Sequence, residues 1–147
     1  MTATDLAALD QQIQHNEGWR PYLYDDATGQ RITQGSTVIG HPTIGYGFNL
    51  DALELPTDVG NVWFAHQRTR VINELFRALP WTPQLGAGPI RALTDLAYNA
   101  GVNGLMGFHK MLACLQHGDL VGAQREVIHS GLAPGRAQRL AALLLEP

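Results

Sequence analysis

Hydrophobic positions along the first part of the chain follow a helical repeat. Three apolar residues fall on one helical face: Leu6, Leu9 and Ile13. The pattern predicts a helix from Thr4 to about Asn16, with Thr4 as its N-cap. Gly18 is a typical stop signal, so we expect the helix to end near Glu17. The Glu17 carboxyl would then lie at the last turn of the apolar stripe, near the core side.

Residues 19–50 lose this repeat, and glycines alternate there with threonines and aromatic residues. Alternation of this kind, interrupted by glycine, is typical of short strands and turns. Asp26-Ala27-Thr28-Gly29 has the composition of a hairpin turn. We expect a small antiparallel sheet built from the runs RPYLYDD, QRIT, STVIG and TIGYG.

From Thr57 onward the helical repeat returns. A long helix is predicted over 59–79, and the segment Pro80-Trp81-Thr82-Pro83 should end it. Gly101 is the predicted C-terminal stop of the next helix. The helices expected after the proline segment cover 89–100, 105–117, 119–129 and 135–145.

Composition restricts the class of protein. With 147 residues, 45% of them hydrophobic and 16% charged, the chain has the size and composition of one globular domain. The single cysteine, Cys114, excludes an internal disulfide framework. The longest aliphatic run, residues 140–145, is too short to cross a bilayer. The first residues lack the features of a signal peptide, so we expect a protein made in the cytoplasm and not exported by the usual signal.

Charge is divided unevenly along the chain. Residues 1–60 carry eight acidic residues and two arginines, whereas residues 61–147 carry eight basic and five acidic residues. The net charge of −3 disfavours nucleic acid as a partner. The asymmetry fits either two lobes with differently solvated faces or a cleft for a ligand of mixed charge.

Two carboxylic acids suggest a chemistry. Glycoside hydrolysis needs one carboxyl that gives a proton to the leaving oxygen and a second, ionised one that activates water. Glu17 at a helix end and Asp26 in a hairpin, nine positions later, meet this requirement. The six histidines show no metal-binding spacing, so no metal site and no cofactor are predicted.

An ordered set of motifs resembles the phage T4-type lysozymes, glycoside hydrolase family 24, over nearly the whole chain. The motifs are Glu17-Gly18, Asp26, Thr43-Ile44-Gly45-Tyr46-Gly47, Ala97-Tyr98-Asn99-Ala100-Gly101, Gly107-Phe108, Leu115 to Asp119 with Ala123, and Gly135-Arg136-Ala137-Gln138-Arg139.

The resemblance implies roles for particular residues. Glu17 would be the general acid, Asp26 the group that positions or activates water, and Thr43 the hydroxyl that holds this water. The implied reaction is inverting hydrolysis of the β-1,4 bond between N-acetylmuramic acid and N-acetylglucosamine. Substrate-binding positions carried over from the family are Tyr46, Asn99, Phe108 and Arg136, the last matching an arginine that pairs with the catalytic glutamate.

Several positions depart from the family pattern. Thr43 lies 17 positions after Asp26, farther than usual, so Thr28 and Thr33 compete for its role. Asp25 competes with Asp26, and the spacing from Glu17 alone favours Asp26. Phe48 replaces a histidine, and the segment before Arg136 is shorter than usual.

The implied fold is a mostly helical α+β, lysozyme-like fold of two lobes in a single domain. A small N-lobe with β-hairpins would cover about 14–57, a connecting helix about 58–79, and a helical C-lobe about 80–147, on which the first helix could pack. We expect a monomeric phage endolysin that acts on bacterial peptidoglycan after release through a membrane pore, without stable membrane insertion. A tail-associated phage lysozyme is a variant of this prediction. A lytic transglycosylase and an inactive cell-wall-binding module are the alternatives.

Overall fold

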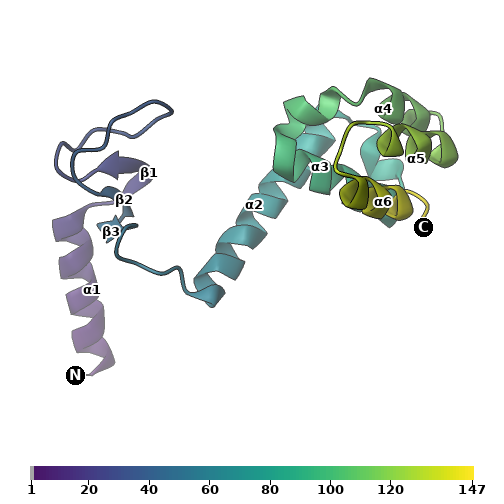
Figure 1. The fold of residues 1–147 in the computed structure, drawn as a ribbon. Helices are drawn as coiled ribbons and strands as arrows, with labels where there is room; N and C mark the ends of the chain where they lie inside the picture. The colour runs from purple at the N-terminus through teal and green to yellow at the C-terminus, as the bar shows by residue number, and fades with distance from the viewer. Residues whose placement is uncertain (1) are drawn as a thin grey trace. The chain divides into compact units, whose positions relative to one another are not determined.

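The structure, a computed structural model, describes residues 2–147 and divides into two compact units, 1–56 and 57–147. Within the described residues, the first unit holds one helix and a three-stranded antiparallel sheet, and the second holds helices α2 to α6 (Figure 1). The predicted class, mostly helical α+β, is confirmed. The boundary after Pro56 groups the long helix α2 with the other helices of the second unit.

Helix α1 (Ala3–Glu17) begins one residue before its predicted cap, Thr4. Thr2, not Thr4, is the N-cap, because Asp5 stands three residues after it and completes a capping box. The Thr2 Oγ1 accepts the Asp5 N–H at 3.2 Å, and the Asp5 carboxylate accepts the Thr2 N–H at 2.7 Å. Gly18, with a φ of 67°, ends the helix where the sequence predicted. Within the first unit, no residue of α1 is buried, and its apolar stripe is exposed.

The sheet has the order β1-β2-β3, with β1 at Arg20–Asp25, β2 at Pro42–Gly45 and β3 at Phe48–Asn49. Thr43 is central, because it pairs with Tyr24 of β1 and with Asn49 of β3. Its side chain is accordingly buried, with 3% exposed. The motif from Thr43 to Gly47 thus forms a strand and the turn that follows it.

Two of the predicted strands are absent from the described structure. Within QRIT, Arg31 makes only an isolated bridge to Tyr24, and STVIG is a loop. The reason is that the backbone N–H groups of Ile39 and Gly40 donate to the Asp25 carboxylate rather than to a neighbouring strand. Residues 30–41 therefore form a long loop between β1 and β2, which we call the insertion loop.

The second unit follows the predicted order of helices, with shifted ends. Helix α3 continues past its predicted stop, but Gly101 (φ 70°, ψ 165°) interrupts its helical geometry at the expected place. The helix predicted from residue 105 begins only at His109, after a turn at Gly107. The elements are α2 (Thr57–Ala78), a 3-10 turn (Thr82–Gln84), α3 (Ala87–Met106), α4 (His109–Gln116), α5 (Leu120–Ile128) and α6 (Pro134–Leu143).

The hydrophobic core lies in the second unit. Its buried cluster runs from Val71 to Leu144, and Leu75, Leu93 and Leu105 are completely buried. In the first unit, Tyr24 is the buried hydrophobic side chain among the described residues. Among residues 2–147, no helix has the length and apolar character needed to cross a membrane.

Candidate active site

Glu17 stands at the C-terminal end of α1, against the turn between β2 and β3. Its carboxylate lies so close to Gly47 that a Cβ on this glycine would be 2.6 Å from Oε2. Gly47 also has a φ of 72°, a conformation that side chains disfavour. The final glycine of the Thr43–Gly47 motif therefore suits the backbone conformation, and a side chain there would displace the Glu17 carboxylate.

Asp25 and Asp26, which competed for one role in the sequence, have different surroundings. Asp25 is buried and accepts backbone N–H groups from Ala27, Ile39 and Gly40 at 2.8–3.0 Å. The bond from Ile39 is the main cause that lowers the pKa of Asp25. The hydrogen bonds of this carboxylate therefore attach the insertion loop to β1.

Asp26 is exposed, at the start of the turn after β1. Within residues 2–147 its carboxylate accepts one hydrogen bond, from the His41 N–H to Oδ1 at 2.7 Å. Its second oxygen can therefore accept a proton from water or substrate. Asp26, the residue favoured by spacing, thus has the exposure that a reacting carboxylate needs.

Strand β1, which separates the two acids in the sequence, pairs irregularly with β2. Arg20 pairs with Gly45 and Tyr24 with Thr43, so β1 uses four residue steps where β2 uses two. Extra residues of this kind bulge a strand and re-aim its side chains. Glu17, beside Gly47, and Asp26, bound to the His41 N–H, lie beyond opposite ends of β2, Pro42–Gly45.

Thr43 presents a hydroxyl on the same sheet. Its Oγ1 donates to the His41 carbonyl at 3.2 Å, which leaves the oxygen able to accept a hydrogen bond. The competing residues lie elsewhere: the Oγ1 of Thr28 accepts from the Gln30 N–H, and Thr33 is bound to Ser36 in the insertion loop. Of the three threonines, Thr43 is the one in the central strand.

His41 was not predicted from the sequence as a site residue. Its ring Nδ1 lies 3.0 Å from Asp51 Oδ2, and this hydrogen bond is the main cause that raises the pKa of His41 above 6.5. Asp26 and Asp25 add smaller effects in the same direction. The only sequence signal was the place of His41 two positions before Thr43, which is weak.

Tyr46 lies in the β2–β3 turn and packs against Trp19, with ring centroids 5.0 Å apart. Trp19 is 61% exposed, and its ring also borders Gly45 beside Phe48. An aromatic surface thus adjoins Glu17, and Trp19 was not predicted from the sequence as part of it.

The other predicted binding residues belong to the second unit. Arg136 donates to the Asp95 carboxylate at 2.8 Å, and Asn99 is 3.5 Å from the same oxygen. Asp95, which was not predicted, therefore joins two predicted positions. Phe108 lines a separate shallow hollow together with Lys110, Glu126, His129 and Ser130.

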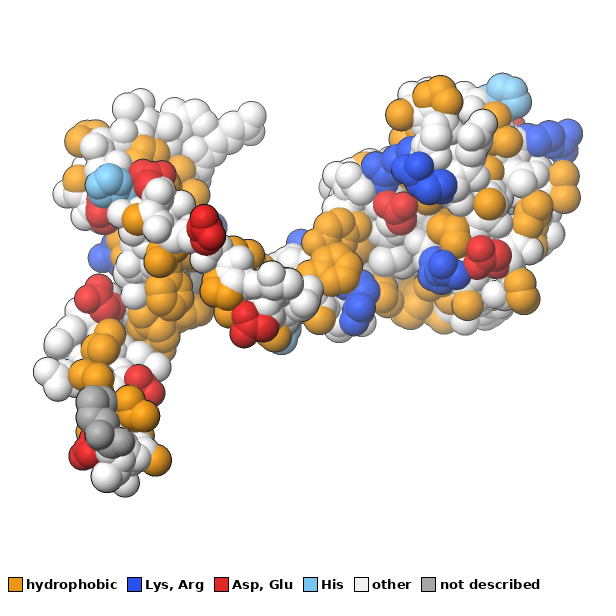
Figure 2. All heavy atoms as spheres, turned by 60° about the horizontal axis from the view of Figure 1, so that its bottom comes forward, with side chains coloured by type: hydrophobic (Ala, Val, Ile, Leu, Met, Phe, Trp, Pro, Cys, Tyr) orange, Lys and Arg blue, Asp and Glu red, His pale blue; other side chains and the backbone are white. Residues whose placement is uncertain are grey.

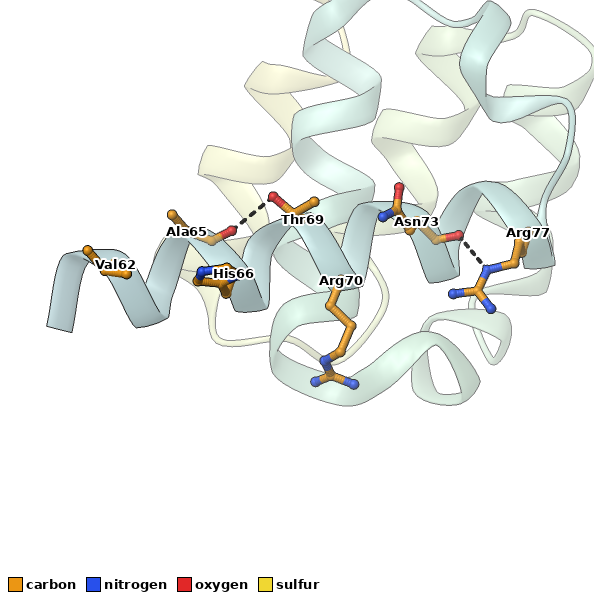
Figure 3. Close-up of a pocket in the computed structure, with 7 residues that line it drawn as sticks. All are labelled: Val62, Ala65, His66, Thr69, Arg70, Asn73 and Arg77. Carbon is orange, nitrogen blue, oxygen red and sulfur yellow. Dashed lines mark hydrogen bonds between the residues drawn. The ribbon is translucent and has the colours of Figure 1, made fainter. Parts of the chain in front are cut away.

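A second surface hollow runs along α2 and includes none of the predicted residues (Figure 3). All its lining residues come from that one helix, so it is an open groove rather than an enclosed cavity. They are Val62, Ala65, His66, Thr69, Arg70, Asn73 and Arg77.

Charge follows the division of the chain. On the face shown in Figure 2, the blue basic side chains gather on the second unit, whereas red acidic side chains dominate the first. Among the described residues, no group of three potential metal-binding side chains is present.

No model of a protein family matches this sequence, and no curated protein matches it at a significant level.

Proposed function

We propose that this protein is a peptidoglycan hydrolase that cleaves the β-1,4 bond between N-acetylmuramic acid and N-acetylglucosamine. The observation that carries the proposal is the placement of Glu17, Asp26 and Thr43 around one short strand, β2. The order of motifs that resembles the phage T4-type lysozymes supports it.

In the proposed reaction, Glu17 gives its proton to the glycosidic oxygen as the bond to the anomeric carbon breaks. A water molecule attacks this carbon from the opposite side and loses a proton to Asp26. Thr43 Oγ1 accepts a hydrogen bond from the same water, which orients its lone pair. Inverting glycosidases place their two carboxyls about 6.5–9.5 Å apart, which leaves room for the attacking water.

The remaining predicted residues bind the glycan in this proposal. Tyr46, packed on Trp19, offers an aromatic face for a sugar ring next to Glu17. Asn99 and Arg136, joined through Asp95, and Phe108 in its hollow provide binding groups on the second unit. We propose that the protein acts as a phage endolysin, reaching the wall of the host from its cytoplasm.

The test is mass spectrometry of the products that the protein releases from purified peptidoglycan. Wild type should produce reducing muramic ends with the mass of one added water. Glu17→Gln should lower turnover by about 10²–10⁴-fold without unfolding the protein, because it removes the proton donor. Glu54→Gln, an exposed acid outside the site, is the matched control and should keep full activity.

Other products would change the assignment. Anhydro-muramic ends would indicate a lytic transglycosylase, in which the muramic C6 hydroxyl replaces water and Asp26 is dispensable. Protein that pellets with the wall and releases nothing would indicate a binding module. Near-normal activity of Glu17→Gln would exclude Glu17 as the acid.

A further inference from the structure

One residue, His41, is bound to both side chains that the proposed function assigns to the water. Its N–H donates to Asp26 Oδ1 at 2.7 Å, and its carbonyl accepts the Asp26 N–H at 3.1 Å. The same carbonyl accepts the Thr43 hydroxyl at 3.2 Å. Any displacement of this residue would move the carboxylate and the hydroxyl together.

The residue before it, Gly40, leaves room for this arrangement. A Cβ on Gly40 would collide with Asp26 Oδ1 and stand 2.8 Å from the Ala27 nitrogen. Asp25 holds the Gly40 N–H at 3.0 Å from the other side. The end of the insertion loop is thus fixed against the acidic turn by two consecutive carboxylates.

The His41 ring anchors the same residue from outside. It is bound to Asp51, just after β3, and the charged groups that face it are Asp51, Asp26 and Asp25. All three are acidic, so the protonated ring is favoured. The ring and its partner are more than half exposed, at 57% and 55%, so changes to either are compatible with folding.

We propose that His41 is a positioning residue: its peptide groups set Asp26 and Thr43 relative to each other, and its ring, bound to Asp51, holds those peptide groups in place. The catalytic consequence rests on the proposed function. The positioning of Asp26 and Thr43 by His41 rests on the hydrogen bonds alone. In this proposal, the end of the insertion loop positions the two side chains that bind the water.

The kinetic test compares His41→Ala and Asp51→Asn with His117→Ala, an exposed histidine of the second unit that serves as control. Both site variants should lower kcat by about 10- to 100-fold with little change in KM, because small misplacements of reacting groups have effects of this size. Wild-type kcat should also fall on the alkaline side as His41 loses its proton. This inflection should be missing in His41→Ala, and the control should match wild type throughout.

A second measurement does not depend on activity. Hydrogen exchange of the residue-41 amide, followed by NMR, should be slow in wild type and at least several-fold faster in Asp51→Asn and in Gly40→Ala. Unchanged exchange in both variants, or a rise in KM with unchanged kcat, would overturn the proposal. If wild type cleaves no peptidoglycan, the proposed function fails, and the exchange measurement still decides whether His41 positions Asp26.

Discussion

At the scale of single residues, the adjacent aspartates Asp25 and Asp26 differ in burial and in hydrogen bonding. Asp25 is buried and bound by three backbone N–H groups, whereas its neighbour Asp26 is exposed with one such bond. The spacing from Glu17 favoured Asp26, but sequence alone could not show what Asp25 does. Its partners are Ile39 and Gly40, 14 and 15 positions away in a segment without a recognisable motif.

Gly47 offers a test of the contact with Glu17. Gly47→Ala should cost about 1–2 kcal/mol of backbone strain and also displace the Glu17 carboxylate, so that activity falls together with stability. Gly35→Ala is the matched control, because Gly35 has a φ of 86° but nothing within 4 Å. Thermal unfolding and turnover should separate the two variants. Equal activity in both variants would mean that the function of the Glu17 carboxylate does not depend on the space that Gly47 leaves beside it.

At the scale of elements, helices were predicted better than strands. Gly18 and Gly101 interrupt helices where expected. Glycine readily adopts the positive φ that ends a helix, so the residue type alone marks the position in the sequence. The strand predicted at STVIG failed because its hydrogen-bonding partner is a side chain, Asp25, and not a strand. The cap at Thr2 was missed because Thr4 stood closer to the first apolar position, while the reciprocal bond from Asp5 decides the start.

The attachment of the insertion loop should depend on pH. The pKa of Asp25 in the folded protein lies below its ordinary value of 3.8, so its contribution to stability is complete above that value and is lost as the pH falls through the folded pKa. The indole NMR signal of Trp19 reports unfolding of the first unit. Between pH 6 and pH 2, Asp25→Asn should lose less stability than wild type and start less stable, whereas the exposed Asp10→Asn should follow wild type. A wild-type pH dependence in Asp25→Asn would assign the acid sensitivity to other groups.

At the scale of the whole molecule, stability is divided unequally. The buried cluster from Val71 to Leu144 belongs to the second unit, and the first unit buries few apolar side chains. The sequence indicated this division through the return of the helical repeat near Thr57. It could not show that the first unit itself would bury no residue of its helix, because an apolar stripe predicts a buried face but not the element that covers it.

The distribution of the core predicts how the separate parts behave. A fragment of residues 57–147 should keep a helical circular dichroism spectrum and a cooperative thermal transition, since it contains the whole cluster. A fragment of residues 2–56 should show no cooperative transition, because domains of this size with a small core are marginal. Loss of cooperative melting in the longer fragment would contradict this account.

The way the insertion loop is fastened has a practical consequence. Its first end is fixed by the Ile32 and Asp25 N–H groups, which donate to Leu23 and Gln30, and its last end is fixed by the two aspartates. Between them, Gly35 is exposed and surrounded by open space. Closing a longer loop costs little extra entropy once both ends are held. An affinity peptide or a fluorophore placed at Gly35 should therefore label the loop beside the proposed catalytic residues without moving Asp25 or Asp26.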